Sequence, residues 1–179
     1  MKNFFKRINR IFQDYMREKR LKIGKVIWDK KEKTNIVKGD NFIKDNNIKS
    51  ILFLRYDGKI GDMIVNSLMF REIKKVYPDI KIGLVARGAA IDIVKDNPNV
   101  DEIYEYHKDR KKIKDLALKI REEKYDLLID FSEMLRVNQM MLINLSGARI
   151  NIGIEKENWK LFDVSLNVRD FNQHISELY

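Results

Sequence analysis

The sequence predicts an α/β fold in which a parallel sheet carries helices on both faces. Two observations support this prediction. Short apolar runs, which are typical of buried parallel strands, alternate with helical segments from residue 50 to residue 152. Hydrophobic residues also make up 44% of the 179 residues, a fraction large enough for a buried core.

The expected elements follow one another along the chain. Strands are expected at Ser50–Tyr56, Ile80–Ala86, Glu102–Tyr106, Tyr125–Asp130 and Arg149–Ile152. Helices are expected at Asp62–Tyr77, Ala89–Lys95, Asp109–Glu123 and Glu133–Leu145. The weaker pattern after Gly153 is compatible with an edge strand at Leu161–Val168 and a helix that begins at Phe171. The spacing in the first helix predicts its inward side chains: Ile64, Leu68 and Val76, broadened by Met63, Phe70 and Ile73.

The first 50 residues hold all of the excess positive charge. They contain 15 basic and 6 acidic residues, whereas the rest of the chain contains 21 of each. The globular part is therefore neutral, which disfavours a basic DNA-binding domain, and no nucleic-acid partner is expected. We divide the chain into a basic helix and arm at 1–49 and a domain at 50–179.

A basic amphipathic helix is expected over residues 3–21. Phe4, Ile8, Ile11 and Tyr15 share one helical face, and basic residues surround it. Such a helix can pack its apolar face on the domain or on a partner chain, or it can lie in an anionic membrane surface. Residues 22–49 are expected to form a linker or irregular arm, with a short strand at Lys25–Trp28.

No feature of the sequence indicates export or metal binding. No apolar run approaches the roughly 20 residues that cross a bilayer, and charges interrupt every apolar stretch near the N-terminus. The chain has no cysteine and only two histidines, His107 and His174, so no metal site is expected. The expected location is the cytoplasm, at the inner face of the cell membrane if the basic helix binds lipid.

The loop after the first strand carries the strongest functional signal. It runs from Arg55 to Asp62 with the sequence RYDGKIGD. Ligands bind beyond the carboxyl ends of the strands in open α/β sheets, and Gly58 and Gly61 allow a close backbone approach. The loop matches neither the dinucleotide fingerprint nor the P-loop, because a third glycine is missing and Lys59 precedes Gly61. Taken alone, such a glycine pair more often makes a tight turn.

Asp62 stands at the start of the helix that follows this loop. A carboxylate in that position is commonly a helix cap or a partner of the helix dipole. It can also serve as a general base at the mouth of a cleft. Spacing alone does not decide between these roles.

Five separated motifs occur in an order that is informative as a set. They are Gly-Asp at 61–62, Tyr-Pro-Asp at 77–79 before the strand at 80–86, NPNVDEI at 97–103, YDLLID at 125–130 and SGARINIG at 146–153. Together they resemble the family-9 glycosyltransferases, the lipopolysaccharide heptosyltransferases and their relatives. The resemblance covers residues 50–179 and implies a Rossmann-like domain, the N-terminal, acceptor-binding half of a two-domain GT-B fold.

The resemblance also implies roles for single residues. Asp62 would be the catalytic base, which deprotonates an acceptor sugar hydroxyl for inverting attack on an anomeric carbon. Arg136 resembles the family's basic residue for acidic acceptor groups. The remaining acceptor-binding candidates are Gly58, Lys59, Gly61 and Arg87. The family often has small hydroxylated residues where this chain has Asp57-Gly58-Lys59-Ile60, a departure that concerns the acceptor more than the base.

Two further positions are compared with the family. Asp130, at the end of YDLLID, is expected to order the loop after it. His174 matches a histidine near the family's crossover between domains, and no role is assigned to it.

The resemblance implies no cofactor and no metal. The substrate would be a nucleotide-sugar donor such as ADP-heptose, held mainly by the C-terminal domain of the GT-B fold. Since the resemblance covers only the N-terminal half, we expect this chain alone to be inactive or nearly so. Expected partners are an acidic glycolipid or glycan acceptor, and a C-terminal domain or a second copy of the chain. The alternative is a non-catalytic module that binds a glycan or a partner and docks through its basic helix.

Overall fold

The computed structural model describes residues 2–156 and 159–167. Its centre is a six-stranded sheet in which all paired strands are parallel. In spatial order the strands are β3 (Glu102–Glu105), β2 (Lys81–Ala86), β1 (Ser50–Arg55), β4 (Leu127–Asp130), β5 (Ile150–Ile154) and β6 (Val164–Leu166). The five predicted main strands are confirmed, and β6 lies within the predicted edge strand.

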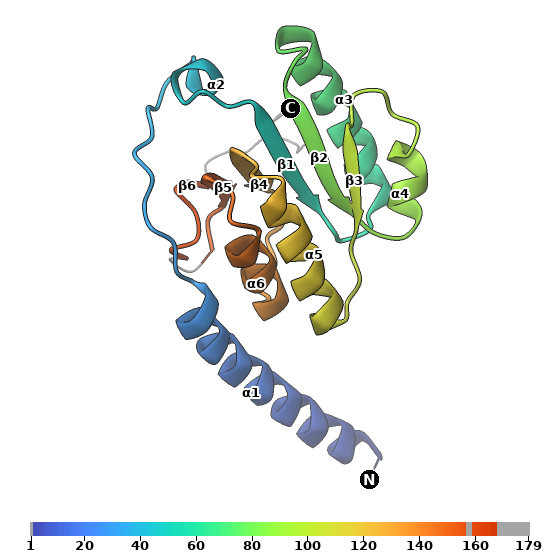
Figure 1. The fold of residues 1–179 in the computed structure, drawn as a ribbon. Coiled ribbons are helices and arrows are strands. Elements are labelled where there is room, and N and C mark those ends of the chain that lie inside the picture. Colours follow the sequence, from blue (N-terminus) through green and yellow to red (C-terminus); the bar gives the residue numbers. More distant parts are fainter. Residues whose placement is uncertain (1, 157–158, 168–179) are drawn as a thin grey trace.

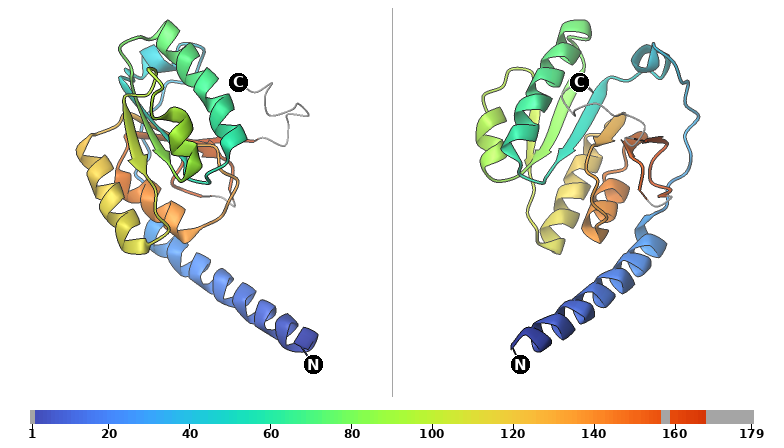
Figure 2. Two further views of the ribbon diagram at one scale, coloured as in Figure 1. Left: turned by 90° about the vertical axis from the view of Figure 1, so that its right-hand side faces the viewer. Right: turned by 180° about the vertical axis from the view of Figure 1, so that it is seen from behind.

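Helices cover both faces of this sheet (Figures 1 and 2). The four helices of the domain are α3 (Ile60–Val76), α4 (Ala89–Val94), α5 (Arg110–Glu122) and α6 (Val137–Ser146). One core cluster contains buried residues of α5 and α6, and the other contains buried residues of α3 and α4. The predicted fold class is therefore confirmed, although α6 begins later than predicted, at Val137.

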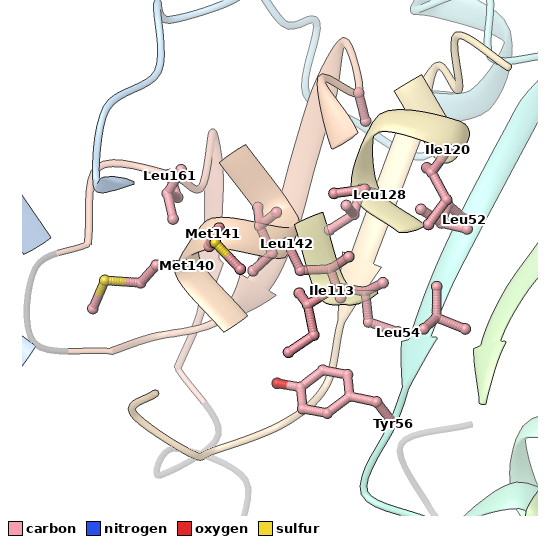
Figure 3. Packing of buried hydrophobic residues seen from close by; sticks show 14 of the residues in the cluster. Leu52, Leu54, Tyr56, Ile113, Ile120, Leu128, Met140, Met141, Leu142 and Leu161 are labelled. Atoms are coloured by element: carbon pink, nitrogen blue, oxygen red, sulfur yellow. The ribbon is translucent and has the colours of Figure 1, made fainter. Parts of the chain in front are cut away.

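Successive residues of β1 contribute to the two core clusters in turn. Leu52 and Leu54 belong to the cluster with α5 and α6, whereas Ile51 and Phe53 belong to the cluster with α3 and α4. This division follows from the alternation of side chains along a strand. Figure 3 shows the first cluster, where Leu52 and Leu54 lie near side chains of both covering helices. Burial of each of these four side chains contributes about 1.5–3 kcal/mol, so both faces of β1 help to hold the helices in place.

The predicted inward face of α3 is wrong in part. Met63 and Phe70 are buried as predicted, and Asn66 is buried between them. Three other predicted inward residues are at least half exposed: Ile64, Leu68 and Val76. The ring of Phe70 packs on Phe53 of β1 with centroids 4.9 Å apart, and this contact fixes the rotation of the helix on the sheet.

The N-terminal helix is longer than predicted. Helix α1 runs without interruption over Lys2–Trp28, so the predicted strand at Lys25–Trp28 is wrong. Its last turns pack on α6: a Cβ on Gly24 would lie 2.7 Å from both Cγ atoms of Val137. Leu21 and Trp28 pack against the same core cluster. The close contact of Gly24 explains why the helix continues along the surface of the domain.

The arm that follows α1 is attached to the domain along its length. It contains the short helix α2 (Phe42–Asp45), which the sequence did not predict. Lys31 Nζ lies 2.6 Å from Asp163 Oδ2, and Ile48 is buried in the core under α3 and α4. Figure 1 shows the arm passing along the β6 side of the sheet. The helix predicted from Phe171, like His174, lies outside the described residues.

Candidate active site

The strand order creates a topological switch point between β1 and β4. Strands β2 and β3 lie on one side of β1, and β4, β5 and β6 lie on the other. Ligands of open α/β sheets bind at the carboxyl ends of the strands at such a point. Two loops border it, residues 56–59 after β1 and residues 131–136 after β4. The glycine loop that the sequence singled out therefore lies where this fold usually binds its ligand.

Asp62 occupies the first turn of α3 and is partly accessible, with 31% of its side chain exposed. Its Oδ2 atom is 3.8 Å from Arg55 Nη1 and 3.8 Å from Lys59 Nζ. The cap position of α3 is occupied by Lys59, which makes no side-chain cap hydrogen bond, so Asp62 is not the N-cap residue. A partly accessible carboxylate between two cations can accept a proton or act as a partner of the helix dipole.

Arg55 positions the Asp62 carboxylate from the end of β1. It is the last residue of β1, and only 5% of its side chain is exposed. Its guanidinium carbon lies 5.3 Å from the centre of the Phe131 ring, which belongs to the loop after β4. Arg55 therefore joins the two loops that border the switch point.

Gly58 brings the glycine loop against the end of β2. Its φ angle is 76°, in the left-handed region that favours glycine. A Cβ there would lie 3.4 Å from the carbonyl oxygen of Arg87. Gly61, in contrast, has open space on the side where a Cβ would project. The structure thus gives a conformational reason for Gly58 and places Arg87 beside it.

The charges of Arg136 and Arg87 both act on Tyr106. Arg136 is exposed and occupies the N-cap position of α6, where it makes no side-chain cap hydrogen bond. Burial raises the pKa of Tyr106, and the positive charges of Arg136 and Arg87 oppose this rise. The rings of Tyr106 and Tyr56 have centroids 4.9 Å apart. Both predicted arginines therefore influence Tyr106 from the loops of different strands, and Arg136 also influences Tyr56.

A buried polar network lies beneath the loop after β4. Asp130 is fully buried, and its Oδ2 atom is 2.6 Å from Nζ of Lys156. Asp130 Oδ1 accepts the backbone N–H of Ser132 at 3.1 Å, and Gln139 Nε2 donates to Asp130 Oδ2. The hydroxyl groups of Ser132 and Tyr56 are 3.1 Å apart. The loop-ordering role expected for Asp130 thus has a direct structural basis.

The electrostatics of this network reflect its burial. Burial lowers the pKa of Lys156, and the Asp130 carboxylate opposes this effect. Burial also raises the pKa of Tyr56 well above its usual value, and Asp130 raises it further. The Lys156 ammonium lies 5.0 Å and 5.2 Å from the ring centres of Trp159 and Phe162. Because Lys156 is enclosed, it can order the loop but cannot reach a substrate in this conformation.

Two charged residues of the site, Arg55 and Lys156, were not predicted from the sequence. Arg55 ends a strand that is otherwise apolar, and a charged residue in such a strand is an uncommon feature that could have marked it. Lys156 belongs to no motif and lies 26 positions after Asp130, so no local pattern points to it.

Within residues 2–156 and 159–167, no group of three or more His, Asp or Glu side chains is placed to hold a metal ion. In that part of the chain, no helix combines the length and apolarity needed to cross a membrane. A cavity of about 640 Å³ lies away from the switch point, and it is lined by Lys25, Val26, Asp29, Lys30, Lys31, Glu32 and Lys160.

The strand order, with Gly-Asp at the start of the helix after β1, defines a Rossmann-like domain similar to the N-terminal part of GT-B glycosyltransferases. The chain is 28% identical over 99 residues to lipopolysaccharide heptosyltransferase 3 of Escherichia coli, a match that covers 51% of this chain and 28% of that protein. Residues 94–179 also match a family of unknown function (DUF6913).

Two solved structures share the fold. E. coli ADP-heptose lps heptosyltransferase II has a TM-score of 0.55 and 19% identity, over 67% of this chain and 36% of that one. A glycosyltransferase of family 9 from Veillonella parvula has a TM-score of 0.63 and 18% identity, over 80% of this chain and 41% of that one. The resemblance to family 9 that the motifs predict is therefore confirmed. The chain spans less than half the length of each of these relatives.

Proposed function

We propose that this chain is the N-terminal, acceptor-binding half of a heptosyltransferase-like inverting glycosyltransferase in the synthesis of lipopolysaccharide or another cell-surface glycan. The position of Asp62 is the observation that carries this proposal. It is a partly exposed carboxylate in the first turn of α3, beside the switch point of the sheet. The similarity to two heptosyltransferases supports the reaction class.

In the proposed reaction, Asp62 accepts the proton of an acceptor hydroxyl. The acceptor oxygen attacks the anomeric carbon of a nucleotide-sugar donor such as ADP-heptose, and the bond from that carbon to the diphosphate oxygen breaks. Attack from the face opposite the leaving diphosphate inverts the configuration. Arg55 and Lys59, each 3.8 Å from the carboxylate, hold Asp62 beside the switch point.

The acceptor would be acidic and would bind through cations near the switch point. The charges of Arg136 and Arg87 act on Tyr106, whose ring packs on Tyr56, and Lys59 lies in the glycine loop. Arginine recognises carboxylate and phosphate groups through paired hydrogen bonds. This geometry supports an acceptor that carries a phosphate or carboxylate near its reacting hydroxyl.

Donor binding is assigned to a second domain. In the proposed enzyme that domain binds the nucleotide and neutralises the leaving diphosphate, a form of electrostatic stabilisation that usually dominates such reactions. We therefore expect no transfer from ADP-heptose by the 179-residue chain alone. Measurable transfer by the pure chain would contradict this assignment.

Calorimetric titration with a phosphorylated core oligosaccharide of lipopolysaccharide tests the acceptor site. Arg136→Gln should weaken binding about tenfold, which corresponds to roughly 1.4 kcal/mol. Arg121→Gln is the matched control, because Arg121 is an exposed arginine in the last turn of α5, a different helix from the one that Arg136 precedes. Equal affinities for the two variants would remove Arg136 from the acceptor site.

Turnover tests the base. With the donor-binding half supplied, Asp62→Asn should reduce transfer by about 10²–10⁴-fold, the usual contribution of a general base. Acceptor affinity should stay within about twofold, because asparagine keeps the shape of the side chain. Unchanged turnover would exclude Asp62 as the base.

The alternative is a non-catalytic module that binds a glycan or a partner and docks through its basic helix. The exposed apolar residues of the basic helix α1, among them Ile11 and Phe12, favour keeping this second candidate. The adjacent coding DNA separates the two: a segment for a donor-binding domain supports the enzyme, and unrelated genes support the module.

A further inference from the structure

Helix α1 has two apolar faces with different surroundings. Leu21, Gly24 and Trp28 face the domain and pack against α6 and its core cluster. The second face, here called the apolar stripe, is exposed and consists of Ile8, Ile11, Phe12, Tyr15, Ile23 and Val26. With 3.6 residues per turn, the two faces lie on roughly opposite sides of the helix. Figures 1 and 2 show α1 extending beyond the domain, which it meets only near its C-terminal end.

The exposure of the apolar stripe shows whether α1 packs this face on the domain or leaves it accessible to another partner. The stripe includes residues that could have packed on the domain, yet Ile11 and Phe12 are 61% and 60% exposed. The domain is instead held by the opposite face. The stripe is therefore available for another partner.

The charge of α1 complements an anionic surface. The helix contains nine basic and two acidic residues, a net charge of +7. Lys19 and Lys22 lie within or beside the stripe, and Lys19 Nζ is 4.7 Å from the centre of the Tyr15 ring. Long lysine side chains can cover apolar surface while their ammonium groups reach polar headgroups. A basic helix with an apolar face of this kind suits the interface of an anionic bilayer.

The spacing of the stripe favours a flat surface over a partner helix. Phe12 and Ile23 are eleven residues apart, as are Tyr15 and Val26. An eleven-residue repeat gives 3.67 residues per turn, so the stripe stays on one side of a nearly straight helix. A heptad seam that starts at Ile8 would instead bring charged residues to its core positions: Glu18, Lys22 and Lys25.

The lysine-lined cavity adds positive charge at the C-terminal end of the stripe. Val26 belongs to the stripe and also lines this cavity, together with Lys30 and Lys160. The cavity contains Asp29, whose Oδ1 atom accepts the backbone N–H groups of Lys160 and Leu161 at 2.6 Å and 3.0 Å. That carboxylate is thus engaged in holding the loop, and the four lysines that line the cavity outnumber its other acidic residue, Glu32.

We propose that α1 lies in the surface of an anionic phospholipid membrane, with the apolar stripe at headgroup depth and the domain held above it by the opposite face of the helix. This proposal concerns where the protein acts and does not depend on the role of Asp62.

Vesicle co-sedimentation of the full chain tests the proposal. The wild-type protein should bind vesicles of phosphatidylcholine and phosphatidylglycerol at least about tenfold more tightly than vesicles of phosphatidylcholine alone, and added salt should weaken binding. Phe12→Ser/Val26→Ser should reduce binding to the anionic vesicles about tenfold or more. Leu68→Ser/Val76→Ser is the matched control, because it removes two exposed apolar side chains from α3. This control should bind within about twofold of the wild type.

Equal binding by all three proteins would overturn the proposal, and so would equal loss in both variants. Sedimentation velocity tests the competing occupant, a second copy of the chain. If Phe12→Ser/Val26→Ser dissociates a wild-type oligomer without changing vesicle binding, the stripe is a protein interface and the proposal is wrong. Both stripe positions are exposed, so the variant should keep the wild-type circular dichroism spectrum and melting temperature.

Discussion

Replacing Lys156 with methionine should destabilise the domain strongly, because it leaves a buried carboxylate without its cation. Lys156 Nζ is 2.6 Å from Asp130 Oδ2, and the two side chains are 1% and 0% exposed. Methionine is unbranched and fills a similar space, so the change removes the charge with little loss of packing.

The magnitude follows from the contacts that remain. Breaking a buried ion pair by removing one partner typically costs about 3–5 kcal/mol. Asp130 retains hydrogen bonds from Ser132 and Gln139, so we expect a cost near the lower limit. Burial also lowers the pKa of Lys156, which means that enclosing its charge is itself unfavourable. For a domain of this size, about 3 kcal/mol lowers the melting temperature by roughly 6–12 °C.

Urea unfolding of four proteins measures the coupling free energy between Asp130 and Lys156. The set is the wild type, Lys156→Met, Asp130→Asn and the double variant. The double variant should recover most of the loss, since asparagine needs no cation and still accepts the Ser132 N–H. A coupling free energy of about 2 kcal/mol is expected from this cycle. A loss below about 0.5 kcal/mol for Lys156→Met, or no recovery in the double variant, would refute the reasoning.

Three further changes test other parts of the fold. Gly83→Ala should cost about 1–3 kcal/mol in urea unfolding, because its Cβ would overlap the hydroxyl of Tyr125. Burial raises the pKa of the Tyr125 hydroxyl above its usual value. As the pH rises, the hydroxyl therefore loses its proton in the unfolded chain before it does so in the folded chain. The free energy of unfolding consequently falls as the pH rises above about 10. Tyr125→Phe should flatten that alkaline decline by at most about 1.4 kcal/mol per pH unit, as measured by unfolding between neutral and alkaline pH. Asp29→Ala should cost about 2 kcal/mol and speed amide hydrogen exchange at Lys160 and Leu161, whose N–H groups Asp29 accepts. Unchanged exchange at both amides would contradict the role of Asp29.

The sheet could be predicted because its signal is local. Each main strand is a short apolar run, and regular alternation with helices implies parallel pairing. The rotation of α3 could not be predicted in the same way. Apolar residues surround that helix, with Met63 and Phe70 on one side and Ile64 and Leu68 on another, so periodicity does not select the buried face. The contact with Phe53 selects it.

The end of α1 shows the limit of local propensity. Residues 25–28, Lys-Val-Ile-Trp, contain β-branched and aromatic residues that favour a strand when taken alone. The structure continues the helix because Gly24 approaches Val137 closely and Trp28 packs on the core. Tertiary contacts with α6 therefore override the local preference.

The candidate site was predictable only where it is local in sequence. Gly58, Lys59 and Asp62 fall within one loop and the start of α3. The ion pair between Lys59 and Asp62 joins residues three positions apart, a contact that spacing can suggest. The pairing of Asp130 with Lys156 depends on the order of β4 and β5 and on the loop beyond them. No pattern in the sequence indicates that Asp130 and Lys156 lie in contact.

The sheet separates the proposed base from Arg136, one of the proposed acceptor-binding residues. Arg55 and Asp62 lie on the side of α3, with Phe131 packed against that core, whereas Tyr56 belongs to the core under α5 and α6. The loop after β4 crosses between the two sides: it begins at Phe131, is fixed at Ser132 by Asp130 and Lys156, and ends at the start of α6. A change in the buried network should therefore shift the arginine at the end of that loop more than the carboxylate in α3. In the proposed enzyme, loss of the Lys156 ammonium would then weaken acceptor binding while the base keeps its cations.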